Sequence, residues 1–152
     1  MITGKWLPEE GDLTEIKRIR AEVFADSPAI AAHGARPDAF CMHALVCNSA
    51  GEPAAVGSAL FDGTEYSIAG LGVRKAERGN GYGDFLLRML LDRALASHAR
   101  KVSCDAPAGT EGFFTRLGFV PCGEAFMEDG VTWVPLERPC SAPVDCCSCV
   151  VC

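Results

Sequence analysis

The feature that most constrains this fold is a glycine-rich loop between a strand-like segment and the clearest helix of the chain. Residues 64–74 read TEYSIAGLGVR, the loop continues as KAERGNGYG, and residues 84–99 read DFLLRMLLDRALASHA, with an apolar face at helical spacing. The first turn of such a helix leaves backbone N–H groups unpaired, and the helix dipole makes that end attractive to anions. With Arg74, Lys75 and Arg78 leading into the glycines, the loop predicts a site for a small anionic ligand.

Composition narrows the class of protein. The chain has 152 residues, of which 49% are hydrophobic and 22% charged, as is typical of one globular domain. The formal net charge of −6 argues against nucleic acid as a partner, and no apolar run reaches the roughly 18 residues of a membrane span. The opening residues, MITGKWLPEEG, have no apolar core of the signal-peptide type. We therefore expect a cytoplasmic protein whose partners include neither nucleic acid nor a membrane.

Local patterns predict a mixed order of strands and helices. Apolar residues recur at helical intervals between 13 and 23, and a second short helix is expected at 110–118, ending at a glycine. Segments bounded by turn residues predict strands at 41–48, 54–61, 64–74, 101–106, 119–127 and 131–137. Gly70 and Gly72 within one strand indicate a bulge or a close approach by another molecule. We expect an α/β (α+β) fold in which helices cover both faces of a mostly antiparallel mixed sheet.

The loop does not match two common phosphate-binding motifs. A nucleoside-triphosphate loop needs a glycine followed by Lys and Ser or Thr, and Tyr82-Gly83-Asp84 supplies neither. The dinucleotide fingerprint needs G-x-G-x-x-G, whereas the glycines here are spaced G-x-G-x-G. The alternative is a glycine-rich loop that only turns a corner.

Two motifs in order carry a family resemblance. Arg78-x-x-Gly81-x-Gly83, after a strand that ends in LGV, resembles the coenzyme A pyrophosphate loop of the GCN5-related N-acetyltransferases (GNAT). Thirty residues later, FFTRLGFVPCGE resembles the second signature of that family. The resemblance covers the chain up to about Leu136. It implies a GNAT domain of the small bacterial type at 1–138, followed by a cysteine-rich tail at 139–152.

The resemblance also implies how a cosubstrate binds. In it, the backbone around Leu71 and Val73 pairs with the pantetheine arm of acetyl-coenzyme A (acetyl-CoA), and the N–H near Leu71 polarises the thioester carbonyl. The residues expected around the pyrophosphate are Arg78, Gly79, Asn80, Gly81, Tyr82 and Gly83, with Asp84 opening the helix. The implied function is transfer of an acetyl group to a primary amine of a small molecule or peptide, by direct attack in a ternary complex.

The chain departs from the family at the proton-transfer positions. Ser67 stands where many members carry a carboxylate, and Phe114 stands where the usual acid is a tyrosine. The nearest candidates for catalysis are Asp105, Glu65 and Tyr66, and Asp105 has a structural role at a strand end as its alternative. The alternative function is an acetyl-CoA-binding sensor or interaction module with little transferase activity.

Few other residues point to a function. Trp133 falls where related chains place substrate-facing residues, but a core tryptophan is the alternative. His33, His43 and His98 have no ligand spacing and are expected to be ordinary packing or surface residues. The acidic chain mildly favours a cationic amine as acceptor, and monomer and homodimer both stay open.

The tail PCSAPVDCCSCVVC concentrates five cysteines, namely Cys140, Cys146, Cys147, Cys149 and Cys152. Stable disulfides are disfavoured in a reducing cytosol. Clustered thiolates bind soft metals, so one hypothesis is a zinc or copper(I) site in the tail. A mobile reduced tail and a redox-responsive disulfide are the alternatives.

Overall fold

The computed structural model describes residues 2–7, 13–33 and 41–140, and its elements follow the predicted order. The predicted strand at 119–127 is divided into two short strands. The elements are β1 (Thr3–Leu7), α1 (Thr14–Val23), α2 (Pro28–Ala32), β2 (Met42–Cys47), β3 (Pro53–Phe61), β4 (Tyr66–Val73), the 3-10 turn η2 (Lys75–Glu77), α3 (Tyr82–Ala96), β5 (Lys101–Pro107), α4 (Glu111–Thr115), β6 (Val120–Pro121), β7 (Phe126–Glu128) and β8 (Val131–Pro139).

The described strands form one eight-stranded sheet in the order β1-β2-β3-β4-β5-β8-β6, with β7 paired to β8. Neighbouring strands run antiparallel except β4 and β5, which are parallel. A parallel pair needs a crossover connection, and α3 supplies it. This confirms the predicted α+β fold with a mostly antiparallel sheet.

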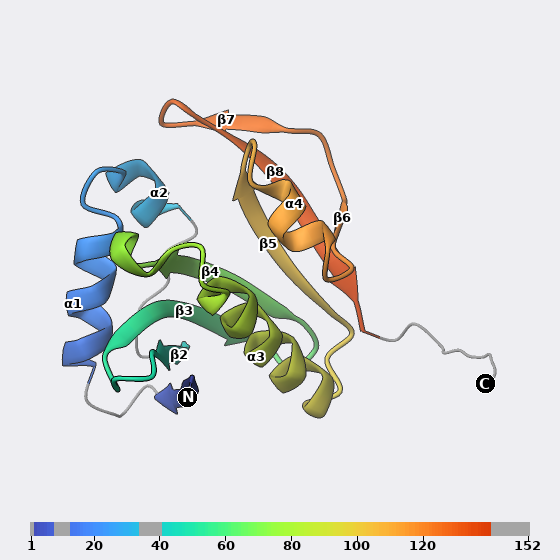
Figure 1. Ribbon diagram of the computed structural model, residues 1–152. Helices are drawn as coiled ribbons and strands as arrows, with labels where there is room; N and C mark the ends of the chain where they lie inside the picture. The colour runs from blue at the N-terminus through green and yellow to red at the C-terminus, as the bar shows by residue number, and fades with distance from the viewer. Residues whose placement is uncertain (1, 8–12, 34–40, 141–152) are drawn as a thin grey trace.

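Helices α1 and α3 cover opposite faces of this sheet (Figure 1). Alternate residues of a strand point to opposite faces, so each helix packs on its own set of side chains. The apolar cluster under α1 contains Ile16, Ile19, Leu45, Cys47 and Val56. The larger cluster under α3 includes Leu86, Leu87, Leu90, Leu91, Ala44, Val46 and Ala55.

Strands β4 and β5 pair at one end only and then separate. The paired positions are Tyr66 with Val102 and Ser67 with Ser103. In the other half of β4, Gly70 and Leu71 have no register partner on β3, because Val56 pairs with Gly72 and Ser58 pairs with Ala69. Gly70 has a φ of +67°, which a residue with a side chain rarely adopts. The bulge predicted at this glycine is present, and beyond the paired end the two strands form a V (Figure 1).

The predicted metal site in the tail falls largely on residues outside the described ranges. Cys140, the last described residue, is half-buried, and its backbone N–H donates to the carbonyl of Arg100 at 2.9 Å. Within residues 2–7, 13–33 and 41–140, no group of three or more His, Cys, Asp or Glu side chains is placed to hold a metal ion. The tail site and the domain boundary at 138 stay predictions. Among the described helices, none is long and apolar enough to cross a membrane.

The packing of α3 leads to a stability prediction. Leu90 is 2% exposed on the face of α3 that meets the sheet, whereas Leu95 on the same helix is 42% exposed. Leu90→Ala should lower the free energy of unfolding by about 2–5 kcal/mol, because it removes buried methyl groups and leaves a cavity. Leu95→Ala is the matched control and should change it by less than about 1 kcal/mol. Urea denaturation measures both, and equal losses would contradict this account of the core.

Candidate functional site

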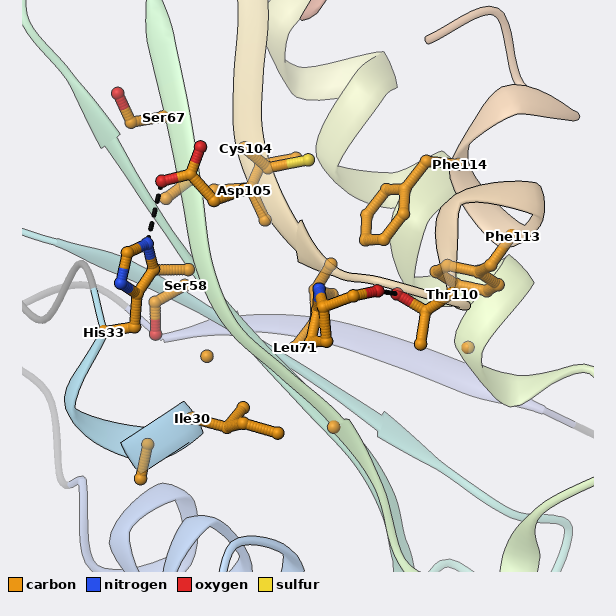
Figure 2. A pocket seen from close by; sticks show the side chains of 18 of the residues that line it. Ile30, His33, Ser58, Ser67, Leu71, Cys104, Asp105, Thr110, Phe113 and Phe114 are labelled. Atoms are coloured by element: carbon orange, nitrogen blue, oxygen red, sulfur yellow. Dashed lines mark hydrogen bonds and ion pairs between the residues drawn. The ribbon is translucent and has the colours of Figure 1, made fainter. Parts of the chain in front are cut away.

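The V between β4 and β5 opens onto a cavity of about 860 Å³. Its walls come from α1, α2, β3, β4, α3, β5, α4 and β8, so it lies where most of the described elements meet. Figure 2 shows Leu71 in its middle, with His33 and Asp105 on one side and Phe113 and Phe114 on the other. A large concave pocket with a few polar groups is the first place to look for a binding site.

One wall of the cavity is the exposed edge of β4. All six residues 68–73 line it, and the register with β5 ends before them at Ser67. The predicted contacts Leu71 and Val73 therefore lie on a strand edge that no described strand covers. Such an edge pairs readily with an extended chain of amide groups, as an added strand would.

The loop and the start of α3 form the next wall. Gly81 occupies the N-cap position of α3 with a φ of +83°, and no described side chain caps the helix. The first backbone bond of α3 runs from Phe85 N–H to the Gly81 carbonyl, so the N–H groups before it have no intrahelical acceptor. A Cβ atom added at Gly79 or Gly81 would meet nothing within 4 Å, which leaves open space in front of the loop backbone.

Side chains of the loop hold the loop itself. Arg78 lines the cavity and donates from Nε to the carbonyl of Val73 at 3.1 Å, and Asn80 donates to the carbonyl of Glu77 at 3.1 Å. Asp84 in the first turn of α3 forms an ion pair with Arg88 at 2.8 Å. This pairing partly offsets a negative charge that would otherwise repel an anion at the helix N-terminus.

The two signature motifs of the sequence meet at Gly83. A Cβ at this position would lie 3.2 Å from the ring of Phe113 and 3.3 Å from the side chain of Val73. The absence of a side chain thus lets α3 start directly against α4 and the end of β4. Phe114, the next residue of α4, is 7% exposed, lines the cavity and packs edge-to-face on Phe119.

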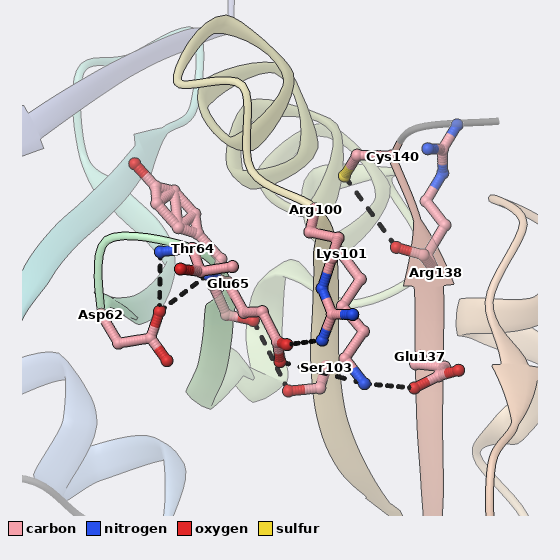
Figure 3. Close-up of polar contacts among 10 residues, drawn as sticks. Asp62, Thr64, Glu65, Arg100, Lys101, Ser103, Glu137, Arg138 and Cys140 are labelled. Carbon is pink, nitrogen blue, oxygen red and sulfur yellow. Dashed lines mark hydrogen bonds and ion pairs between the residues drawn. The ribbon is translucent and has the colours of Figure 1, made fainter. Parts of the chain in front are cut away.

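Two of the three predicted catalytic candidates lie away from the cavity. The hydroxyl of Tyr66 bonds to the hydroxyl of Ser97 at 2.9 Å, and the ring is 5% exposed. Glu65 forms ion pairs with Arg100 and Lys101 at the paired end of β4 and β5 (Figure 3). Neither side chain is among the described residues that line the cavity. Glu65 thus links the start of β4 to the start of β5, and Tyr66 links β4 to the end of α3.

Asp105 is the predicted catalytic candidate that does line the cavity. It follows Cys104 on β5, whose thiol also lines the cavity wall. Burial, with the nearby negative charges of Asp105 and Cys122, raises the pKa of the Cys104 thiol to about 12. This thiol is therefore protonated at neutral pH and a poor nucleophile.

His33, expected to be ordinary, is a central side chain of the site. Its Nε2 lies 2.8 Å from Asp105 Oδ2 and its Nδ1 lies 2.6 Å from Glu128 Oε2. Its ring stacks on Trp133 with a centroid distance of 3.8 Å and an interplanar angle of 16°. Burial acts to lower the pKa of His33, but hydrogen bonds and charges from Asp105 and Glu128 outweigh it and raise the pKa above 6.5.

No local signal in the sequence could have identified this cluster. His33 is 72 residues from Asp105 and 95 from Glu128, and it lies at the end of the short helix α2. Trp133, expected either in the core or facing a substrate, is both 3% exposed and among the residues that line the cavity. His43, by contrast, is an ordinary packing residue as expected, fully buried with Nδ1 2.7 Å from Ser58 Oγ.

The fold is similar to that of several solved structures. ElaA of Escherichia coli is 23% identical, with a TM-score of 0.77 over 91% of this chain and 99% of that chain. An acyl-CoA N-acyltransferase from Pseudomonas aeruginosa is 21% identical, with a TM-score of 0.74 and the same coverage. A GNAT family acetyltransferase from Elizabethkingia anophelis, solved with acetyl-CoA bound, is 13% identical, with a TM-score of 0.68 over 91% of this chain and 97% of that chain. No curated protein sequence matches the chain.

The family model described as an acetyltransferase (GNAT) domain matches residues 19–139. This match includes both signature motifs, the bulged strand β4 and the V-shaped opening beside it. The chain therefore belongs to the GNAT acetyltransferase family, whose members are acyl-CoA-dependent N-acyltransferases.

Proposed function

We propose that this protein transfers an acetyl group from acetyl-CoA to a primary amine of a small molecule or peptide, by direct attack in a ternary complex. The observation that carries the proposal is the uncovered edge of β4, which leads directly into a glycine loop and an uncapped helix N-terminus. The pantetheine arm is an extended chain with two amide groups, and it ends in a diphosphate. The two parts of the ligand thus match the two neighbouring parts of the cavity.

The residues present fit this cosubstrate. The space in front of Gly79 and Gly81 can take phosphate oxygens against backbone N–H groups, with Arg78 beside them. The bulge turns the backbone near Leu71 out of the β3 ladder, where an N–H can polarise a carbonyl oxygen. The structurally similar Elizabethkingia anophelis enzyme has acetyl-CoA bound, which supports the same ligand here.

Direct attack agrees with the chemistry of the cavity wall. Acetyl-CoA supplies an activated thioester, whose C–S bond breaks as the amine nitrogen bonds to the carbonyl carbon. A covalent route through Cys104 is disfavoured, because its thiol stays protonated at neutral pH. Phe114 cannot donate a proton to the leaving group, but a thiolate is a stable leaving group without a dedicated acid. Among the described lining residues, Asp105 is the carboxylate that can contact the ammonium of the acceptor.

The cosubstrate assignment can be tested with a pair of glycine variants. Gly81 and Gly51 have the same φ of +83° and the same open space around them, but Gly51 lies in the turn between β2 and β3. Asparagine tolerates this backbone conformation, so folding should suffer little at either site. Gly81→Asn should weaken acetyl-CoA binding at least tenfold, measured by calorimetry, because its side chain fills the space in front of the loop. Gly51→Asn should leave the affinity unchanged, and equal affinities in the two variants would contradict the assignment.

The transferase activity can be tested by the release of free thiol. Acetyl-CoA is incubated with the protein and a panel of amines containing spermidine, glucosamine, an aminoglycoside, and peptides with a free amino terminus or a lysine. We expect release that depends on the amine and far exceeds the rate without protein. Tight acetyl-CoA binding with no release across the panel would contradict the transferase and favour the acetyl-CoA sensor.

A further inference from the structure

The side chains of His33, Asp105, Glu128 and Trp133, here called the His33 cluster, contact one another through His33, and three of them (His33, Asp105 and Trp133) line the cavity. Figure 2 shows His33 and Asp105 on the far side of Leu71 from Phe113. They come from the residue that follows α2 and from β5, β7 and β8, and none belongs to the glycine loop. The Nε1–H of Trp133 is buried and has no acceptor within the described part of the chain. The cluster is thus placed to meet a second molecule rather than the pyrophosphate.

The two sides of the His33 ring have different surroundings. Asp105, on the Nε2 side, lines the cavity, whereas Glu128, on the Nδ1 side, is half-exposed and is not among the described lining residues. The other rings against His33 are uncharged, namely Phe126 and Trp133. In the described residues, the charges that act on His33 are therefore the two carboxylates. Nε2 faces the cavity side and Nδ1 faces away from it.

The observed distances fit a protonated ring, which can donate to a carboxylate from each nitrogen. A neutral ring keeps one N–H, and the shorter contact, to Glu128, is where that donor is best held. Nε2 and Asp105 Oδ2 would then be two acceptors 2.8 Å apart with no proton between them. A donor from a second molecule relieves this conflict, and an ammonium N–H suits both acceptors at once.

We infer that His33 is the base that takes a proton from the acceptor, which is a protonated primary amine held by Asp105 while Glu128 holds the Nδ1–H of His33. The inference rests on the proposed function and deepens it. In the step, the ammonium N–H bond breaks, the Nε2–H bond forms and the freed nitrogen attacks the thioester carbonyl. The second proton that the nitrogen loses on forming the amide neutralises the leaving thiolate, and His33 releases the first to solvent. A protonated ring that donates from Nε2 to Asp105, which the 2.8 Å distance accommodates, would be the state after this transfer.

If His33 is the base, the pH dependence of the acetyl-transfer rate must follow the protonation of His33. Since the neutral ring is the base, kcat/KM should rise with pH as His33 loses its proton, at a pKa above 6.5. The His33 ring resonances, followed by NMR and assigned with the His33→Gln variant, should titrate with the same pKa. His33→Gln should lower kcat about 100-fold or more and remove this limb of the profile. Its acetyl-CoA affinity should stay within about twofold, because His33 lies away from the loop.

Two glutamate variants separate a base from a structural histidine. Glu128→Gln removes a charge that raises the pKa of His33, so the NMR pKa and the kinetic limb should move together to lower pH. Glu124→Gln removes the same charge from an exposed position that does not act on His33, and it should move neither. A kinetic limb that stays in place while the NMR pKa moves would overturn the inference, as would an unchanged limb in His33→Gln.

Failure of this inference is distinguishable from failure of the proposed function. Amine-dependent thiol release that persists in His33→Gln overturns the role of His33 and leaves the transferase intact. If no amine in the panel is acetylated, the proposed function fails, and spermidine serves as the probe amine for the site in the presence of coenzyme A. An ammonium held at Asp105 should lower the NMR pKa of His33 in the wild-type protein and not in Asp105→Asn. No change on adding spermidine then overturns the amine site as well.

Discussion

The separation of β4 and β5 after two paired positions is the constraint on which the rest of the structure depends. If β5 paired with β4 along its whole length, it would cover the edge of β4 and leave no cavity. The bulge gives the break its physical basis, since it places two residues of β4, Gly70 and Leu71, opposite the single residue Gly57 of β3 and so bends the strand. The loop, the start of α3 and the wall of β5 then take their positions around the opening.

The two ends of the cavity differ in electrostatic character, and this difference would favour an anion at one end and a cation at the other. One end presents Arg78, backbone N–H groups and the N-terminal dipole of α3, all of which favour an anion. The other end presents Asp105 beside His33, with Glu128 behind the ring, and these carboxylates favour a cation. An anionic cosubstrate and a cationic acceptor would therefore be drawn to opposite ends, with their reacting groups meeting between them near Leu71.

Features that depend on residues close together in the sequence could be predicted, whereas features that depend on residues far apart in the sequence could not. The elements, the bulge at Gly70 and the loop before α3 follow from residues that are neighbours in the chain, and the structure has them in the predicted order. The predicted strand at 119–127 is divided because the chain between β6 and β7 leaves β8 and returns to it. The partners of His33 could not be predicted, because tertiary packing alone brings them together. The same holds for Glu65 and Tyr66, which lie at the start of the cavity strand β4 but whose partners are Arg100, Lys101 and Ser97.

Glu65 and Tyr66 stabilise the end of the V at which β4 and β5 are paired. Glu65 is paired with Arg100 (Figure 3). The Tyr66 hydroxyl bonds to Ser97, and the backbone N–H of Arg100 donates to the carbonyl of Thr64 at 2.7 Å. Strands β4 and β5 are held together at one end and diverge from it. A small rotation where they are fastened becomes a larger displacement where they are open. The spacing between thioester and amine would thus depend on residues that touch neither, namely those at the paired end of β4 and β5.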